Sequence, residues 1–329
     1  MIWVTWRQHR TLLVASGGLL ALMLAVLFVT GLGISHTFHA SGLATCLAVP
    51  TRDCGDLASA FSDRYSSLSF LVPLFLVLPA LIGIFWGAPL VAREVEQGTH
   101  RLAWTQTVTR SRWIGTKLAV LFAATAAGAA LFTLVLSWWS RPLVLASDNR
   151  FEPGIFDLRG FVPIAYALFA LALGIAAGAL IRRLVPAMLA TVTGYTLVRF
   201  FIAAFARPHY MATRVWNSSF FGIEPGARAG DWVLSRTTVD GMGNVLGAGH
   251  ELNLNVLIAR CPGLIPSPGS FPDKDATAAC AQRIGLHIQA VYQPGSRFWA
   301  FQGIESAIFV ALAVGLLALS VWLVKRKVS

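Results

Sequence analysis

Few residues in this chain have the types and spacing that catalytic chemistry needs. His36 and His39 have the spacing of metal ligands, but no third ligand accompanies them, so we expect no metal site. The Gly-Thr-Lys tripeptide at 115–117 lacks the order and the glycine-rich lead of a phosphate-binding loop. The His-Glu pair at 250–251 has no neighbours that would complete a catalytic set. We therefore predict that the chain is not an enzyme and has no site of its own for ATP hydrolysis.

Two ionisable residues fall inside long apolar runs, at comparable depths from the same surface. Arg199 lies in the run 184–206 and Glu305 in the run 298–324. Burying an arginine in hydrocarbon costs about 2.5–3.5 kcal/mol, so it should face protein or water and find a partner. We predict that Arg199 and Glu305 form an intramembrane ion pair. The alternative is that the long side chain of Arg199 extends outward to the interface.

The apolar runs that carry these residues dominate the composition. Of the 329 residues, 56% are hydrophobic and only 12% are charged, which is too little polar surface for a soluble globular protein. A helix needs about 20 apolar residues to cross a bilayer, and such runs occur at 12–34, 68–92, 118–139, 161–181, 184–206 and 298–324. The predicted fold class is an all-α integral membrane protein with six transmembrane helices. A cytoplasmic coupling element separates helices 2 and 3, and a small outer domain separates helices 5 and 6.

The net charge of +11 follows from the side on which the basic residues lie. With the N-terminus inside, the cytoplasmic segments have Glu94 and Glu96 as their acidic residues, and their basic residues are Arg7, Arg10, Arg93, Arg101, Arg110, Arg112, Lys117, Arg182, Arg183, Lys325, Arg326 and Lys327. The outer segments are nearly balanced. This asymmetry is the positive-inside pattern, so we predict that both termini are cytoplasmic and that no nucleic acid partner is needed.

The chain divides into a membrane part at 1–206, an extracellular domain at 207–297, and helix 6 with a cytoplasmic tail at 298–329. At its start, Trp3, Trp6, Arg7 and Arg10 recur at three- and four-residue spacing, which places indoles and guanidiniums on one side of a helix. This spacing predicts a short interfacial helix that lies on membrane lipid. The alternative is a cap that only sets the topology. The following apolar run is too long for a cleavable signal peptide and favours a retained anchor.

Small residues and prolines indicate how the helices pack. Gly174 and Gly178 form a GxxxG pair, which allows a close approach of two helix backbones in lipid. Pro73, Pro79 and Pro89 remove backbone donors from the second run and allow it to bend.

The outer segments carry all four cysteines, where oxidising conditions favour disulfides. Of the three possible pairings we favour the one between near neighbours, Cys46 with Cys54 and Cys261 with Cys280. In the outer domain we expect a short helix at 273–285 and a strand at His287–Gln293, and we expect the glycine-rich piece at 241–249 to be a loop.

The charged stretch between the second and third runs carries a family resemblance. Its residues are Arg93-Glu94-Val95-Glu96-Gln97-Gly98-Thr99, then Thr109-Arg110-Ser111-Arg112-Trp113 and Lys117. This order resembles the signature of bacterial ATP-binding-cassette (ABC) exporter permeases of the type-2 class. The resemblance extends to the start Trp6-Arg7-Gln8-His9-Arg10 and to the segment before and within helix 6, which is Gln293-Pro294, Ser296-Arg297-Phe298-Trp299, Gln302 and Glu305.

The resemblance implies a transmembrane subunit driven by a separate ATPase. The segment with Glu94, Glu96, Gly98, Thr99, Arg101 and Arg110 would dock into that ATPase, which would bind ATP and Mg while this chain holds no cofactor. Two permease copies, most simply a homodimer, would join two ATPase copies in the plasma membrane. They would export an amphipathic drug, peptide or lipid by alternating access.

Two other functions compete with this interpretation. One is a membrane sensor or resistance component whose outer domain captures a peptide or lipid ligand. The other is a membrane enzyme, which the absence of a converging acid-base or metal set disfavours. The outer segment is longer than in the simplest exporter permeases, which leaves its role open.

Overall fold

A computed structural model describes residues 2–49, 53–96, 110–147, 150–219, 230–248, 260–261 and 274–327. The chain forms two compact units. Unit 1 comprises Met1–Asp148, Glu152–Arg207 and Trp299–Ser329, and unit 2 comprises Asn149–Phe151 and Pro208–Phe298. The sequence-based boundaries at 206/207 and 297/298 lie next to these, but they leave out the short first piece of unit 2.

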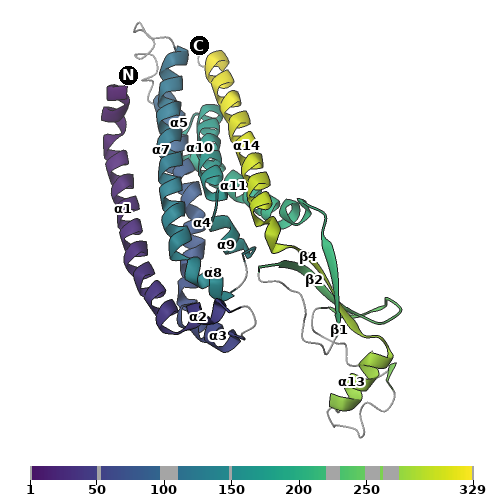
Figure 1. The fold of residues 1–329 in the computed structure, drawn as a ribbon. Helices are drawn as coiled ribbons and strands as arrows, with labels where there is room; N and C mark the ends of the chain where they lie inside the picture. The colour runs from purple at the N-terminus through teal and green to yellow at the C-terminus, as the bar shows by residue number, and fades with distance from the viewer. Residues whose placement is uncertain are drawn as a thin grey trace. The chain divides into compact units, whose positions relative to one another are not determined.

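Unit 1 is helical throughout its described part (Figure 1). Its elements are α1 (Ile2–Ala40), α2 (Leu43–Leu47), α3 (Gly55–Arg64), η1 (Ser66–Phe70), α4 (Leu71–Ile82), η2 (Gly83–Gly87), α5 (Ala88–Glu96), α7 (Arg110–Trp139), α8 (Arg141–Ser147), α9 (Pro153–Leu158), α10 (Val162–Ile181), α11 (Leu184–Phe201), η3 (Ile202–Ala206), η4 (Arg207–His209) and α14 (Phe298–Lys327).

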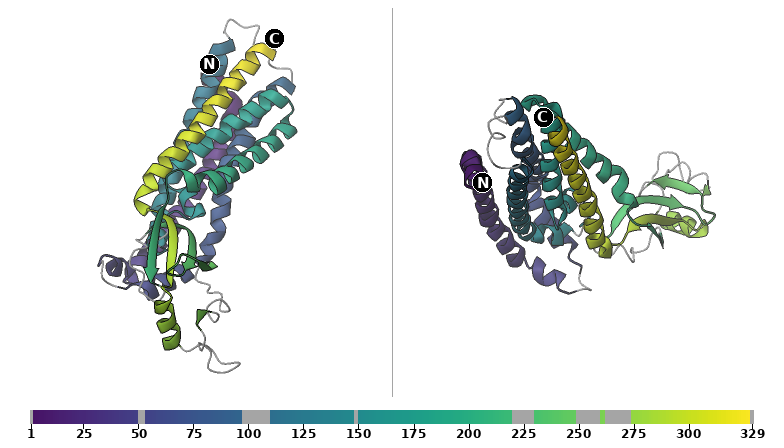
Figure 2. Two further views of the ribbon diagram at one scale, coloured as in Figure 1. Left: turned by 90° about the vertical axis from the view of Figure 1, so that its right-hand side faces the viewer. Right: turned by 90° about the horizontal axis from the view of Figure 1, so that it is seen from above.

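The prediction of six membrane-spanning helices is confirmed for the described residues. The helical segments long and apolar enough to cross a bilayer are Val14–Ala40, Ser66–Arg93, Leu118–Trp139, Val162–Ile181, Leu184–His209 and Gly295–Leu323. In the side views the start of α1 and the end of α14 lie at the same end of unit 1, as an even number of spans requires (Figures 1 and 2).

Helix α10 is the centre of unit 1. Of its most apolar 18-residue window, 72% is buried, whereas the other five spans have 17–24% buried. It packs against α4, η2, α5, α7 and α11. Its sequence explains this position, because seven alanines and two glycines among its 20 residues leave room for close neighbours.

The glycines of α10 bring its backbone against the η2–α5 segment. A Cβ on Gly178 would lie 2.5 Å from the carbonyl oxygen of Ala88, and one on Gly174 would collide with the carbonyl oxygen of Gly83. A Cβ on Gly87 would likewise lie 2.6 Å from the carbonyl oxygen of Leu171. The close packing that the GxxxG pair predicts is therefore found, and its partners are themselves glycine and alanine.

Two spans contain a π-helical turn, which inserts an extra residue into the helix. One is η2, between α4 and α5 of the second span, and the other is η3, at the end of α11. The second span passes through Pro79 and η2 without leaving the helical conformation.

The first helix corrects one prediction about the N-terminus. Helix α1 runs without a break from Ile2 to Ala40, so residues 2–10 continue directly into the helix that carries the first span, Val14–Ala40, and do not form a separate short helix. The reason is local, since neither glycine nor proline occurs before Gly17 to interrupt the helix. Trp3, Trp6 and Arg7 share this helix with Arg10, which is exposed, and a contact of this segment with headgroups stays a prediction.

Unit 2 is built on a four-stranded antiparallel sheet in the order β1-β4-β2-β3. The strands are β1 (Arg214–Ser219), β2 (Trp232–Val239), β3 (Val245–Ala248) and β4 (His287–Gln293). The short helix η5 (Gly295–Arg297) follows β4. Strand β4 has the predicted bounds and pairs Val291 with Val215 on one side and with Ser235 on the other. The remaining strands correct the expectation of a single strand, and β3 lies where a loop was expected.

Helix α13 (Lys274–Arg283) lies within the predicted helix at 273–285 and packs its Ala281 against Leu246 and Leu286. The predicted cysteine pairings are both found. Cys261 and Cys280 are bonded, which ties α13 to the segment before it, and Cys46 is bonded to Cys54 between α2 and α3.

Asp240 closes the turn between β2 and β3. Its carboxylate accepts hydrogen bonds from the side-chain amide of Asn244 at 2.9 Å, from the backbone N–H of Asn244 at 2.8 Å and from the backbone N–H of Met242 at 2.9 Å, and Arg260 lies 3.2 Å away. These bonds, those from Asn244 above all, hold the pKa of the Asp240 carboxyl below its ordinary value. A glycine-rich segment can thus form a defined hairpin because one carboxylate satisfies its backbone.

Candidate functional site

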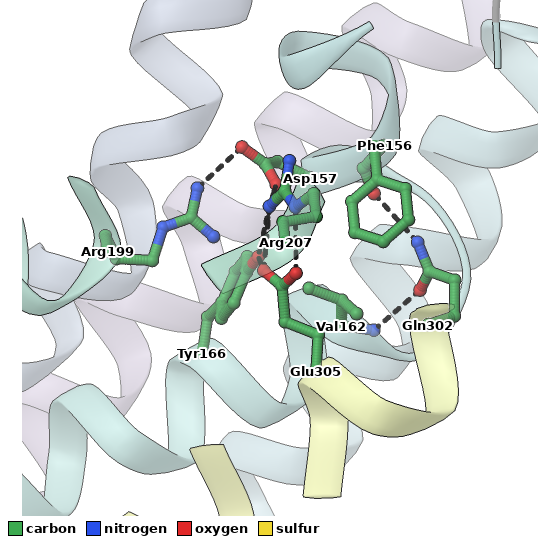
Figure 3. Close-up of polar contacts among 8 residues, drawn as sticks. All are labelled: Phe156, Asp157, Val162, Tyr166, Arg199, Arg207, Gln302 and Glu305. Carbon is green, nitrogen blue, oxygen red and sulfur yellow. Dashed lines mark hydrogen bonds and ion pairs between the residues drawn. The ribbon is translucent and has the colours of Figure 1, made fainter. Parts of the chain in front are cut away.

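A buried charge cluster lies at one end of the helices of unit 1. It consists of Asp157 from α9, Tyr166 from α10, Arg199 from α11, Arg207 from η4 and Glu305 from α14 (Figure 3). Arg207 is 1% exposed, Asp157 4% and Glu305 0%, so these charges have almost no access to solvent. Burying charged groups costs free energy of folding unless each charge is paired, so the stability of the charge cluster depends on how its side chains are paired.

Arg207 is the central cation of the charge cluster. Its Nε and Nη2 donate to the two carboxylate oxygens of Glu305 at 2.8 and 2.7 Å, which is the bidentate geometry of a strong arginine–carboxylate pair. Its Nη2 also donates to Oδ1 of Asp157. The guanidinium lies 4.3 Å from the centre of the Phe156 ring, which closes its other face. Arg207 therefore joins α9 to α14 through both carboxylates.

Arg199 neutralises the remaining charge of Asp157. Its Nη2 donates to Oδ2 of Asp157 at 2.8 Å, and its guanidinium lies 3.6 Å from the centre of the Tyr166 ring. The Tyr166 hydroxyl lies within hydrogen-bonding distance of Oδ1 of Asp157, at 3.1 Å, and of Oε1 of Glu305. Two guanidiniums thus face two carboxylates, with a phenol between the carboxylates, and the charge cluster is neutral as a whole.

Gln302 completes the polar contacts one helical turn before Glu305. Its Oε1 accepts the backbone N–H groups of Phe161 and Val162 at 3.1 Å, and its Nε2 donates to the carbonyl oxygen of Phe156 at 2.9 Å. It therefore satisfies donors at the first turn of α10 and an acceptor of α9, which the apolar surroundings leave without water. Gly160 adopts φ +71° beside this amide, where a Cβ would lie 2.6 Å from Oε1 of Gln302.

The prediction of a direct Arg199–Glu305 pair is corrected by this geometry. Both residues belong to the charge cluster, but Arg199 pairs with Asp157 and Glu305 pairs with Arg207. Depth along the helices placed the two residues at the same level, whereas the direction in which each side chain points gave them different partners.

Sequence reasoning missed Asp157, Tyr166 and Arg207. Asp157 lies in an outer segment, where acidic and basic residues nearly balance, and Arg207 is the first residue of the predicted outer domain. The sequence does contain a signal for a second buried arginine, because Arg207 follows Arg199 by about two helical turns at the end of the same apolar run. Two arginines in one span require two buried or interfacial acids, and Asp157 and Glu305 are the acids that meet this requirement.

The predicted coupling segment is only partly described by the structure. Glu96 is the last residue of α5, and its Oε2 accepts the backbone N–H of Leu184, the first residue of α11, at 3.3 Å. Glu94 belongs to α5, and Arg110 begins α7. Gly98, Thr99 and Arg101 lie outside the described residues. Among the residues that the structure describes, no three His, Cys, Asp or Glu side chains gather as metal ligands would.

Six apolar spans, one of them a central helix rich in glycine and alanine, with a neutral charge cluster buried among the helices, define a multi-pass integral membrane protein. A family model described as ABC-2 membrane transporter related matches residues 17–207, which is more than half of the chain. The chain belongs to this family and is a membrane component of an ABC transporter. It is a transmembrane subunit rather than the catalytic ATPase, and the family implies partnership with an ABC ATPase subunit.

Comparisons with curated proteins and with solved structures find no match.

Proposed function

We propose that the chain is the permease subunit of an ATP-driven exporter that moves an amphipathic drug, peptide or lipid across a bacterial plasma membrane. The observation that carries this proposal is the family match over residues 17–207, which covers five of the six spans. The six apolar spans supply the membrane path, and the positive-inside charge pattern supports cytoplasmic termini.

In this proposal two copies of the chain form a homodimer that binds two ATPase subunits. The segment from Glu94 to Arg110 docks into the ATPase on the cytoplasmic side, and its contact residues are Glu94, Gly98, Thr99, Arg101 and Arg110. ATP and Mg bind to the ATPase and draw its two copies together, and the docking segment moves with them. The two permease copies then pass between inward-open and outward-open states, and the substrate path lies between the copies.

The charge cluster then lies at the outer end of the helices, where it would hold α9, α10, α11 and α14 together. Its neutrality supports this role, because a cluster that is fully paired resists opening more than a single exposed pair would. A bistable contact of this kind suits a gate, since it is either formed or broken.

The proposal is tested by expressing the chain with each ABC ATPase of its source cell in turn and purifying the complex through a tag on the permease. We expect one ATPase to co-purify and to hydrolyse ATP faster with the permease than alone. Replacing Glu94 with alanine should abolish that association, whereas Glu152→Ala, a change at an exposed acid in a predicted outer segment, should leave it intact. Failure of every ATPase to co-purify would refute the proposal.

A second function is favoured by one observation, the separate fold of unit 2. A sheet with its own helix and its own disulfide is more than a connection between helices needs. It supports a sensor or resistance component whose outer unit captures a peptide or lipid. Reconstitution separates the two functions, because an exporter moves a fluorescent short-chain phospholipid or a labelled peptide across vesicles with ATP, whereas a sensor binds it without moving it.

A further inference from the structure

The hydrogen bond between Glu96 and Leu184 closes a gap in the capping of α11. The N-cap residue of α11 is Arg183, whose side chain makes no capping hydrogen bond. The first N–H groups of a helix need acceptors and carry partial positive charge, so a carboxylate is a favourable partner. Glu96 supplies that carboxylate from a different helix, at the end of α5. The cap of α11 is therefore held by the segment that the proposed function assigns to the ATPase.

The contact itself is exposed, but one to two helical turns away α5 is tightly packed against α10 and α11. Gly178 of α10 lies against the backbone of Ala88 in α5, so α5 and α10 have no space in which to slide past each other there. Ala92 of α5 and Ala187 of α11 are both fully buried and belong to one apolar group with Ala88 and Ala177. A displacement of α5 therefore has to move α11 as well, or break the hydrogen bond of Glu96.

The far end of the same helix carries both arginines of the charge cluster. Arg199 lies in the last turns of α11, and Arg207 follows directly after η3. The 18 residues of α11 span roughly 27 Å, so this one helix connects the two ends of unit 1. Its first residue is held by Glu96, and its last turns are held by Asp157 and Glu305.

Three members of the charge cluster lie close in sequence to crossings between the two units. The chain passes between the units after Asp148, before Glu152, after Arg207 and before Trp299. Asp157 follows the crossing before Glu152, Arg207 is the residue at the next crossing, and Glu305 follows the last. The charge cluster therefore fixes, within unit 1, the chain segments at three of the four crossings.

We propose that Glu96 is a positioning residue that passes movement of the coupling segment to α11, and through α11 to the charge cluster and the segments that lead to unit 2. This inference rests on the proposed function, and it separates two acids that the sequence treats alike. Glu94 docks the ATPase, whereas Glu96 caps α11 and transmits the movement.

The test uses hydrogen exchange of the full chain in lipid nanodiscs, first without any ATPase. Glu96→Ala should raise exchange at the first amides of α11 about fivefold, the change that a lost capping bond implies, and should raise exchange in the same direction at Ile202–Ala206. Glu96→Gln should restore part of the protection at both ends, because its amide oxygen can still accept the N–H of Leu184. Glu94→Ala is the matched control and should leave both ends unchanged.

With the ATPase bound, nucleotide should change exchange in β4 of unit 2 for the unaltered chain, and Glu96→Ala should abolish this change while the ATPase still co-purifies. The inference is overturned if Glu96→Ala affects only the first turn of α11 and leaves Ile202–Ala206 as before. It is also overturned if this variant loses the ATPase as Glu94→Ala does, because Glu96 would then be a docking residue. Failure of the unaltered chain to bind an ATPase refutes the proposed function instead, and the exchange measured without ATPase still decides the inference.

Discussion

Replacing Arg207 with methionine removes the cation that joins both carboxylates of the charge cluster. Arg199 then remains as the counter-charge and pairs with Oδ2 of Asp157, so Glu305 keeps a buried negative charge that has lost its bidentate partner. Removing one member of a buried ion pair typically costs about 3–5 kcal/mol of unfolding free energy. We expect Arg207→Met to lie in this range, and Glu305→Leu to do so because it leaves a surplus of positive charge.

The double variant Arg207→Met/Glu305→Leu leaves Arg199 and Asp157 as a neutral pair. Replacing a whole buried pair with apolar residues is often neutral or stabilising, so the double variant should be close to the original chain in stability. Because the double variant costs almost nothing while each single variant costs about 3–5 kcal/mol, the coupling free energy between the two positions should be about 6 kcal/mol or more. Denaturant titration of the purified chain in micelles measures each unfolding free energy.

The control for this cycle is Arg64→Met, at an exposed arginine that ends α3. It should change the unfolding free energy by no more than about 0.5 kcal/mol. The reasoning is refuted if the costs of Arg207→Met and Glu305→Leu simply add in the double variant, because additive costs would mean that the two charges do not depend on each other.

Three other changes have outcomes that the structure specifies. Gly174→Ala should destabilise the chain by about 1–3 kcal/mol, because the new Cβ would collide with the carbonyl oxygen of Gly83. The control is Gly303→Ala, where the new Cβ meets open space and the change should be neutral or stabilising. Thermal unfolding in micelles compares the two variants. The pKa of Asp240 in the folded chain lies below its ordinary value, so the ionised carboxylate stabilises unit 2 at a pH above the ordinary pKa, and this stabilisation is lost as the pH falls through the folded pKa. Asp240→Asn should remove this part of the pH dependence, which hydrogen exchange of the β2–β3 hairpin measures. Replacing Cys261 and Cys280 with serine opens a loop with a sequence separation of 19 and should cost unit 2 about 3 kcal/mol, and unchanged denaturant unfolding of unit 2 would contradict this.

The parts of the fold that sequence could predict depend on local composition. Apolar length fixed the six spans, and the sequence separation of the cysteines indicated their pairing. The alternation at His287–Gln293 located β4, because every second side chain of a strand faces the same side of the sheet. Strands β1 and β2 pair with β4 across long loops, and a local sequence pattern does not indicate such distant pairing. Strand β3 could not be predicted because it is short and lies among the glycines of the 241–249 segment, and its hairpin depends on the hydrogen bonds of Asp240 rather than on strand propensity.

The charge cluster could be predicted only in part, for a geometric reason. The position of Arg199 along its span sets its depth in the membrane, and this depth correctly indicated a buried partner. The partner itself depends on the direction in which the side chain leaves the helix, which the packing of α9 and α10 decides. Asp157 comes from a six-residue helix outside every apolar run, so no scan of membrane spans would include it.

The π-helical turn η3 has a consequence for how chains of this kind can change. A π-helical turn accommodates one extra residue within a helix, so deletion of one residue from Ile202–Ala206 would return this turn to α-helical geometry and leave Arg207 directed at its carboxylates. Deletion of a residue from α11 itself, where successive residues advance by about 100°, would instead turn Arg207 away from them. The π-helical turn is therefore the place in this span where related proteins can gain or lose a residue and still keep the ionic contacts beyond it.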